Sequence, residues 1–279
     1  MSDPNTDRAT VAGFGREWAT FTQSAEAFTD ADRRAMFDAY FAIFPWAALP
    51  RDSVGADIGC GSGRWAMLVA PRVGELHLVD PAPKALAVAR ANLADVGNVC
   101  FHLASVAALP FADGSLDFAY CLGVLHHVPD TAQALRDLAT KLKSGAPFLV
   151  YLYYAFDNRS PAYRALWRIS NAGRLVLSRA PYPVQIAATA TIALLVYWPL
   201  ARTAALLERI GLLPRAWPLA YYRKRAFYVM RTDAFDRFCT RLERRFTRAQ
   251  IADMLGAVGF TDIKFSEQEP FWVAVARKR

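Results

Sequence analysis

Cysteine is scarce in this 279-residue sequence, and no two cysteines stand at a CxxC spacing. The thiols lie far apart, at Cys60, Cys100, Cys121 and Cys239. This distribution excludes a disulfide scaffold and a cysteine-rich zinc site, and it indicates a reducing compartment. The N-terminal segment carries early acidic residues and lacks an apolar run with a small-residue cleavage site, so no secretory signal is expected. The sequence therefore predicts a cytoplasmic protein.

Metal-binding motifs are absent as well. The sequence has 4 histidines, and none stands at a metal-ligand spacing from a cysteine. There is also no HExxH motif and no carboxylate pair. The histidines are His77, His102, His126 and His127. No metal is therefore expected.

Charged residues make up 21% of the chain and hydrophobic residues 54%, which excludes a disordered chain. At roughly 100–200 residues per domain, the length fits one elaborated domain or a domain with a large insertion. Acidic residues are rare between Tyr151 and Arg248, where 17 Lys and Arg stand against 5 Asp and Glu. The same segment contains the longest uncharged run, 22 residues from Ala180 to Ala201. A mildly acidic body thus carries a basic, apolar insert.

Strand and helix patterns alternate along the body. Strands are expected at 75–80, 99–103, 115–121 and 147–153, after a first strand that ends at Asp57, and helices at 29–44, 64–70, 84–93 and 131–141. This alternation predicts an α/β fold with a parallel sheet covered on both faces. Ligands of such sheets bind beyond the carboxyl ends of the strands.

A glycine loop follows the first strand. Gly59, Gly61 and Gly63 occupy alternate positions, starting two residues after Asp57. Glycine permits positive φ and close approach of the backbone to a ligand, and the helix expected next offers unpaired N–H groups. The second strand ends in Asp80, where an acid can accept both ribose hydroxyls of an adenosine. A dinucleotide-binding fingerprint would need the spacing GxGxxG. The GxGxG spacing found here therefore disfavours a dinucleotide-binding loop.

This pattern resembles the class I S-adenosylmethionine-dependent methyltransferases, in particular the ubiquinone and menaquinone type that act on small molecules. Five signatures occur in the family order, at 57–63, 76–80, 109–117, 123–130 and 142–145. The resemblance implies a doubly wound, mostly parallel seven-stranded sheet with an N-terminal helical cover and a helical insertion. It also implies S-adenosyl-L-methionine as the cofactor.

The resemblance assigns roles at the strand ends. Gly59, Gly61 and Gly63 would line the methionine end of the cofactor, and Asp57 would help to hold its amino group. Asp80 would accept from the ribose hydroxyls.

Other expected cofactor contacts surround the adenine. Pro81 would lie against the ring. Ser105 stands where many relatives have an acid that accepts from the adenine amino group, and a hydroxyl accepts more weakly than a carboxylate. The remaining residues expected in the cofactor site are Cys60, Val106 and Cys121.

Two histidines are the candidates for a catalytic base. His126 and His127 follow the fourth strand, where this fold places groups that face the substrate, and a histidine can remove a proton near neutral pH. The alternative is structural: His127 caps the next helix or bonds a backbone group beside Pro129. Methyltransferases of nucleobase amines carry an Asn/Asp-Pro-Pro-aromatic tetrapeptide after that strand, whereas this chain has Cys121–Val124. No nucleic-acid partner is therefore expected.

The resemblance also divides the chain. Residues 1–50 would form the helical cover, in which Phe14, Trp18 and Phe21 share one helix face and either close over the cofactor or pack in the core. Residues 51–154 would form the cofactor-binding core and 155–245 a basic, apolar insertion or lid. Residues 246–279 would return to the sheet as a helix at 246–259 and strands at 261–267 and 271–277.

The apolar run of the insertion has three interpretations: a buried lid helix, an interfacial or re-entrant membrane segment, and a dimer contact. A single membrane crossing is rejected, because it would place the last two strands across the bilayer from their sheet. Pro183 and Pro199 are also expected to limit the helix to 184–198, too short to span. Arginines and aromatic residues across 180–231 suit a peripheral contact with an anionic membrane surface. The sequence does not predict an oligomeric state.

The sequence thus predicts methyl transfer from S-adenosylmethionine to oxygen or carbon of a small or lipophilic, lipid-linked acceptor. Two alternatives stay open: a protein of this fold that binds the cofactor without turnover, and a nucleic-acid methyltransferase that uses the basic insert.

Overall fold

The computed structural model describes residues 5–24, 29–214 and 217–279. The chain divides into two compact units. The first comprises Met1–Thr22, Arg33–Arg159 and Leu242–Arg279, and the second comprises Gln23–Asp32 and Ser160–Arg241. Most of the second unit thus comes from the segment 155–245, and the rest comes from the segment expected as the N-terminal cover.

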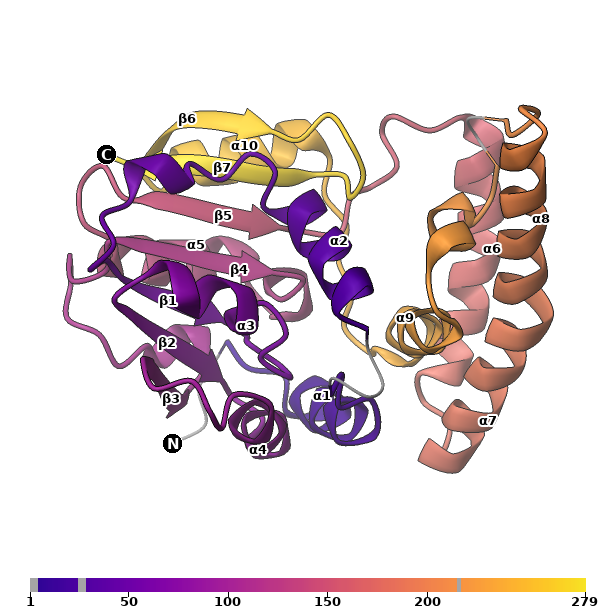
Figure 1. Ribbon diagram of the computed structural model, residues 1–279, viewed down its shortest axis with the longest axis horizontal. Helices are drawn as coiled ribbons and strands as arrows, with labels where there is room; N and C mark the ends of the chain where they lie inside the picture. The colour runs from indigo at the N-terminus through magenta and orange to yellow at the C-terminus, as the bar shows by residue number, and fades with distance from the viewer. Residues whose placement is uncertain (1–4, 25–28, 215–216) are drawn as a thin grey trace. The chain divides into compact units, whose positions relative to one another are not determined.

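A seven-stranded sheet forms the centre of the first unit (Figure 1). Its order is β3-β2-β1-β4-β5-β7-β6, in which β1 to β5 are parallel and β7 is antiparallel to both neighbours. The strands are β1 Val54–Ile58, β2 Glu75–Asp80, β3 Val99–Leu103, β4 Phe118–Leu122, β5 Pro147–Tyr151, β6 Phe260–Phe265 and β7 Val273–Lys278. The predicted doubly wound, mostly parallel sheet is confirmed.

The helices of this part of the chain agree in place with the predicted pattern, although two are shorter. They are α1 Arg8–Thr20, α2 Asp30–Tyr40, α3 Ala66–Val69, α4 Pro83–Asn92, α5 Thr131–Lys141 and α10 Arg248–Ala257. The helix expected at 29–44 ends at Tyr40, and the one expected at 64–70 retains a single α-helical turn. Short 3-10 turns lie at Trp46–Ala48, Ala70–Arg72, Val106–Ala108 and Leu125–His127.

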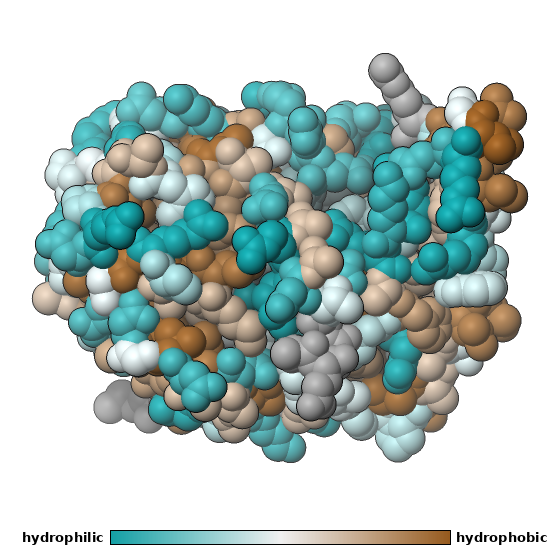
Figure 2. Space-filling view, in the orientation of Figure 1, coloured by the Kyte–Doolittle hydropathy of each residue, from teal (hydrophilic) through white to brown (hydrophobic). Residues whose placement is uncertain are grey.

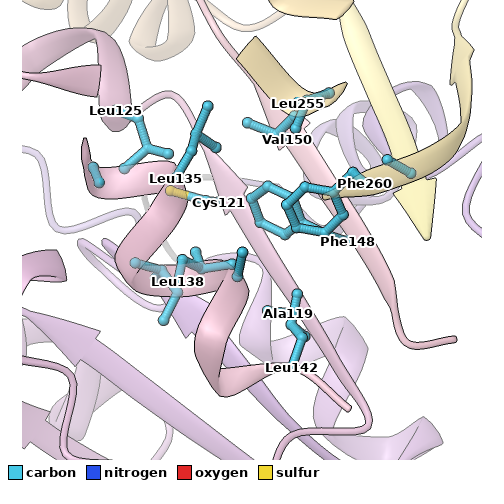
Figure 3. Packing of buried hydrophobic residues seen from close by; sticks show 14 of the residues in the cluster. Ala119, Cys121, Leu125, Leu135, Leu138, Leu142, Phe148, Val150, Leu255 and Phe260 are labelled. Atoms are coloured by element: carbon cyan, nitrogen blue, oxygen red, sulfur yellow. The ribbon is translucent and has the colours of Figure 1, made fainter. Parts of the chain in front are cut away.

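The main hydrophobic core lies between the sheet and helices α5 and α10 (Figure 3). Leu135 and Leu138 of α5 and Leu255 of α10 are fully buried there. Phe148 of β5 stacks on Phe260 of β6, with ring centroids 5.3 Å apart. Because both faces of the central strands are covered, those strands are nearly continuous apolar runs.

The opposite side of β4 packs against aromatic residues from the region of α2. Tyr120 of β4 is fully buried and meets Phe41 edge-on, with ring centroids 5.3 Å apart. Phe41 also stacks on Phe37 and Trp46. Aromatic pairs of this kind hold the chain that precedes β1 against the sheet.

The chain returns to the sheet after the insertion through a short bridge. Tyr154 pairs with Phe246 as an isolated parallel bridge, just beyond the end of β5. Thr247 and Gln250 then form a capping box at the start of α10, which satisfies two N–H groups that the helix cannot. The helix and two strands predicted for the end of the chain follow as α10, β6 and β7.

The second unit is helical among its described residues. Its helices are α6 Pro161–Leu177, α7 Tyr182–Ile192, a π-helical segment Ala193–Tyr197, α8 Trp198–Arg209, a 3-10 helix Ala220–Lys224 and α9 Phe227–Cys239. A small core joins α9 to the π-helical segment and α8, and its buried members are Ala193, Tyr197, Ala201, Met230 and Ala234. Residues 215–216 of the predicted membrane-contact region lie outside the described residues.

The expectation that Pro199 ends the long apolar helix is wrong. The helix continues from Tyr182 to Arg209, 28 residues, and it is long and apolar enough to cross a membrane by length and composition alone. Proline in an α-helix lacks the N–H donor and clashes with the carbonyl four residues earlier, here that of Leu195. The wider π-helical segment contains Leu195 and directly precedes α8, so the local change of helix type accommodates the proline.

Candidate functional site

The carboxyl ends of the five parallel strands share one edge of the sheet. The chain runs from β1 outward to β2 and β3, then crosses back to β4 and β5. The order therefore reverses between β1 and β4, where doubly wound sheets bind their ligands. The loops after β1, β2, β3 and β4 carry the predicted cofactor residues to this edge.

The glycine loop after β1 is tightly packed. Gly59, Gly61 and Gly63 all have positive φ, at 77°, 55° and 74°. A Cβ at Gly59 would lie 2.4 Å from the Val124 side chain, and one at Gly61 would lie 2.9 Å from the Trp18 indole. Both backbone conformation and space thus require glycine, as the predicted loop demands.

Asp57 lies inside the sheet, two residues before the loop, and is 1% exposed. Burial raises the pKa of Asp57 to about 8, because the charged carboxylate loses its water; the Tyr120 hydroxyl opposes this rise, the Asp80 charge adds to it and Arg64 opposes it. The Asp57 Oδ2 atom is buried and has no hydrogen-bond partner among the described residues. Asp57 is therefore a neutral acid below about pH 8, and a cation beside its Oδ2 would favour the ionised form.

Asp80 ends β2 beside the glycine loop. Its Oδ2 accepts from the Gly61 N–H at 3.0 Å, and its Oδ1 accepts from the Ala82 N–H at 2.8 Å. Burial raises the pKa of Asp80 to about 6, although these two backbone N–H groups lower it. The carboxylate therefore fixes the loop to the end of β2, and each oxygen retains a further lone pair for a ligand.

The other predicted cofactor residues lie after β2 and β3, in the glycine loop and in the main core. Pro81 follows Asp80 directly, and Ser105 precedes the 3-10 turn Val106–Ala108 after β3. Val106 and Cys60 are buried. The Cys121 side chain lies in the main core beside α5 (Figure 3), so only its backbone faces the neighbouring strands. Contacts of these residues with a cofactor stay predictions.

Helix α1 lies along the carboxyl edge of the strands. Phe14 packs on His127 after β4, with ring centroids 4.9 Å apart. Trp18 lies over Gly61 after β1, and Gly15 faces Ala82 after β2. Helix α1 also packs beside α4 (Figure 1). Of the two interpretations of the N-terminal aromatic face, this placement favours a cover over the loop region.

The two candidate bases differ in tautomer. His126 is fully buried, and its Nδ1 accepts from the Tyr153 N–H at 3.3 Å, so its proton belongs on Nε2. Burial holds the pKa of His126 well below its usual range, and the positive charges of His127 and Arg245 lower it further. The His127 Nδ1 lies 2.6 Å from the Leu242 carbonyl, to which it donates. This bond leaves Nε2 as the basic nitrogen of His127.

The structural alternative for His127 retains support, because its ring bonds a backbone carbonyl, although that carbonyl is not beside Pro129. Asp130 caps α5 by accepting from the Gln133 N–H, and the carbonyl bonded by His127 belongs to Leu242, far along the chain. The Arg245 guanidinium also lies 4.9 Å from the Tyr153 ring centroid. Sequence spacing held no signal for these contacts, because Leu242 and Arg245 lie far from His127 and Tyr153 along the chain.

Sequence spacing also missed a group of polar side chains on β2 and β3. The ligand atoms of Glu75, His77 and Cys100 all lie within 4.8 Å of one another. Strand pairing places His77 directly beside Cys100. The absence of a sequence motif was thus no guide to metal ligands in this region.

The residues present fit S-adenosylmethionine. The unpartnered, buried Asp57 oxygen suits an ammonium group, and Asp80 lies at the end of the adjacent strand. Gly123, after β4, has a φ of 82° and open space where a Cβ would stand. The site thus offers two carboxyl groups and a glycine loop at the reversal of strand order, with open space beside Gly123.

The raised pKa of Asp57 predicts a pH-dependent stability. The folded protein holds the Asp57 proton up to about pH 8, whereas an unfolded aspartate releases it near pH 3.9. The free energy of unfolding of the ligand-free protein therefore falls as pH rises between these values. We expect Asp57→Asn to reduce the decrease in Tm between about pH 5 and about pH 8.5, measured by calorimetry. Asp95→Asn, at an exposed position, should leave it unchanged; equal effects of both variants would contradict the assignment.

Curated proteins resemble part of this chain in sequence. It is 31% identical to the uncharacterized methyltransferase YcgJ of Bacillus subtilis over 137 residues, 48% of this chain and 54% of that protein. It is 36% identical to the ubiquinone biosynthesis O-methyltransferase of Albidiferax ferrireducens over 108 residues, 38% of this chain and 41% of that protein. The chain spans about half the length, or less, of these curated relatives.

Solved structures share the fold. A protein of Bacillus halodurans C-125, assigned as a methyltransferase, aligns with a TM-score of 0.50 at 16% identity and covers 84% of this chain and 70% of its own. A protein of Haloferax volcanii, solved with the Trm112 methyltransferase activator, gives a TM-score of 0.50 at 16% identity and covers 99% of both chains. The methyltransferase domain family model matches residues 56–150. The predicted resemblance and S-adenosylmethionine as cofactor are thereby confirmed, and residues 56–150 are similar to the methyltransferase domain family.

Proposed function

We propose that the protein transfers a methyl group from S-adenosylmethionine to oxygen or carbon of a small, lipophilic acceptor. The observation that carries this proposal is the glycine loop between two buried carboxylates, Asp57 and Asp80. When bound, the cofactor supplies a methyl group already activated by a positively charged sulfur. The protein then has to hold the acceptor in line and exclude water.

An oxygen acceptor has to lose a proton, and His127 suits this role better than His126. The Leu242 carbonyl fixes the His127 ring and leaves Nε2 basic. His127 lies at the end of β4, on the same edge of the sheet as the glycine loop. The ubiquinone biosynthesis O-methyltransferases among the relatives support an oxygen acceptor on a lipophilic molecule.

The role of Asp80 can be tested by cofactor affinity. Asp80→Ala removes the ribose acceptor and also the carboxylate that holds the Gly61 and Ala82 N–H groups. We expect the Kd for S-adenosylmethionine to rise about tenfold to a hundredfold, since hydrogen bonds to a charged group contribute about 1–3 kcal/mol. Isothermal titration measures this, with Asp113→Ala at an exposed carboxylate as the matched control. An unchanged Kd in folded Asp80→Ala would disprove the ribose assignment.

The role of His127 can be tested by turnover. We expect His127→Gln to lower kcat about a hundredfold or more, the usual contribution of a general base, while the Kd for the cofactor stays unchanged. The assay detects S-adenosylhomocysteine and methylated product from a short-chain polyprenyl catechol. His126→Gln is the control, and it should retain more activity than His127→Gln. The reverse order would assign the base to His126, and cofactor binding without turnover on any acceptor would support a binding protein.

The surface of the second unit supports a lipophilic environment for the acceptor. All but one of the large apolar side chains that are exposed among the described residues belong to this unit. Figure 2 shows hydrophobic surface over the outer side of α8. The members on the helices and the turn after α8 are Leu166, Ile169, Leu175, Val176, Val184, Leu194, Leu195, Val196, Trp198, Leu206, Ile210 and Leu212.

Helix α6 turns its polar side inward and its apolar side outward. Arg174 is 5% exposed and donates to the carbonyls of Thr240 and Arg241. On the other side, Ile169 and Val176 are 72% and 75% exposed. A helix on the surface of a water-soluble protein shows the opposite pattern.

The long helix from α7 to α8 also buries polar residues and exposes large apolar ones. Its inner face consists of polar and small residues, with Gln185 and Thr189 buried and Gln185 donating to the Ser178 carbonyl. Its outer face carries Leu194 and Leu195 at 54% and 66% exposure. Small and polar residues between helices, with large apolar residues outside, are typical of helices that face lipid.

Basic residues border this apolar surface. Arg164, Arg168 and Arg179 are exposed along or just beyond α6, and the segment from Tyr151 to Arg248 carries 17 Lys and Arg against 5 Asp and Glu. Arginines beside an apolar face complement anionic headgroups above a hydrocarbon layer. The partner that fits is an anionic lipid bilayer, held by peripheral contact of α6, α7 and α8, from which a lipophilic acceptor is reached.

Vesicle binding tests this contact. We expect the protein to co-sediment with vesicles that contain phosphatidylglycerol, and raised salt should weaken binding through screening of the arginines. Leu194→Glu and Leu195→Glu should each lower the affinity about tenfold to a hundredfold, because burial of one leucine contributes about 1.5–3 kcal/mol. Leu103→Glu is the matched control, since Leu103 is also an exposed leucine and lies on β3.

Two outcomes would contradict the membrane contact. One is wild-type protein that stays in solution at low salt with anionic vesicles. The other is a dimer in sedimentation velocity that Leu194→Glu dissociates, which would assign the apolar surface to a second copy of the chain. Cofactor affinity of each variant shows whether the first unit remains folded.

A further inference from the structure

A group of candidate metal ligands lies on the face of β2 and β3, outside the proposed cofactor site. Residues alternate between the faces of a strand, so Glu75 and His77 of β2 share one face. Parallel pairing places His77 beside Cys100 and Val79 beside His102, which brings Cys100 and His102 to the same face. Four side chains with metal-binding chemistry thus meet at one edge of the sheet.

The distances in this group suit a small tetrahedral ion. The Glu75 Oε1 atom lies 3.2 Å from the Cys100 Sγ and 3.5 Å from the His77 Nε2. Zinc bonds of 2.0–2.3 Å place tetrahedral ligand atoms roughly 3.3–3.8 Å apart. The third separation, between His77 and Cys100, lies within 4.8 Å, so small side-chain movements would bring the three ligand atoms around one ion.

His102 lies beside His77 and can hold its ring through a hydrogen bond. Its Nε2 lies 3.0 Å from the His77 Nδ1, so the His77 N–H can donate to it while the His77 Nε2 points to the group of ligands. Metal-binding histidines almost always donate their second N–H to such a partner, which fixes the tautomer and the ring. Phe111 packs against both imidazole rings, at centroid distances of 5.1 Å and 5.5 Å.

We propose that Glu75, His77 and Cys100 bind a zinc-class divalent cation, with water in the fourth position. A thiolate, an imidazole and a carboxylate select zinc or cobalt over magnesium and calcium, which prefer oxygen ligands alone. On binding, the Cys100 thiol releases its proton to solvent, and the sulfur forms a bond to the ion. The hydrogen bond from the Cys100 thiol to Glu75 is lost in exchange.

This site joins the edge strand β3 to β2. The group is open to solvent, because the Glu75 side chain is 45% exposed and Cys100 is exposed, so an ion has a path to it. An ion bound across the two strands would stabilise the folded chain in proportion to its concentration over its Kd. The proposal does not depend on methyl transfer or on membrane contact.

Cobalt titration tests the site, because Co²⁺ substitutes for zinc and reports a bound thiolate by charge-transfer absorption. We expect the protein, stripped with chelator, to bind one equivalent of Co²⁺ with this absorption and to release it to Zn²⁺. Cys100→Ser should abolish the charge-transfer band, and His77→Gln should lower the affinity at least tenfold. His102→Phe should lower it about tenfold to a hundredfold, as expected for a residue that orients a ligand.

Cys239→Ser is the matched control, since it removes another thiol from the described residues and should leave the titration unchanged. Zinc should also raise the Tm of the wild type but not of Cys100→Ser. Absence of the band from the wild type, or its persistence in folded Cys100→Ser, would overturn the proposal. Neither result bears on cofactor binding, which titration with S-adenosylmethionine measures separately.

Discussion

The burial of two carboxylates at the ends of adjacent strands is the constraint on which the cofactor edge depends. Asp80 is tolerated there because the Gly61 and Ala82 N–H groups bond to it, and those bonds in turn hold the glycine loop in its positive-φ conformation. Asp57 is compensated less: Tyr120 and Arg64 lower its pKa, but burial outweighs them, so its neutral form is favoured until a cation arrives. The folded chain therefore holds a neutral acid at a position where a positively charged ligand would favour the ionised form.

Much of this edge could be predicted from the sequence, because its determinants are local. Strand and helix periods, the spacing of Gly59, Gly61 and Gly63, and an acid at the end of a strand are all visible without a structure. The mostly parallel seven-stranded sheet and the placement of the last helix and two strands also agreed with prediction. The contacts of His127 could not be predicted, since its partner Leu242 lies 115 residues further along the chain and no sequence pattern marks a backbone carbonyl.

Two other features were beyond sequence reasoning for physical reasons. Pro199 would end the helix if the preceding turn were α-helical, because its ring would clash with a carbonyl of that turn. The preceding turn is π-helical, and this wider turn accommodates the proline. The Glu75, His77 and Cys100 group has no metal-ligand spacing, because pairing of separate strands, rather than position along one strand, brings its members together. Likewise, hydropathy marked an apolar run, but only the folded helices show that its polar side faces inward.

The bridge between Tyr154 and Phe246 separates the sheet from the long insertion. The two ends of the long excursion are already joined at the margin of the sheet, so the segment between them can change in length, charge or helix content without altering strand order. Changes in the excursion would then leave the loops at the carboxyl edge of the sheet in place. Its exposed apolar residues could be replaced by polar ones without moving the glycine loop or Asp80.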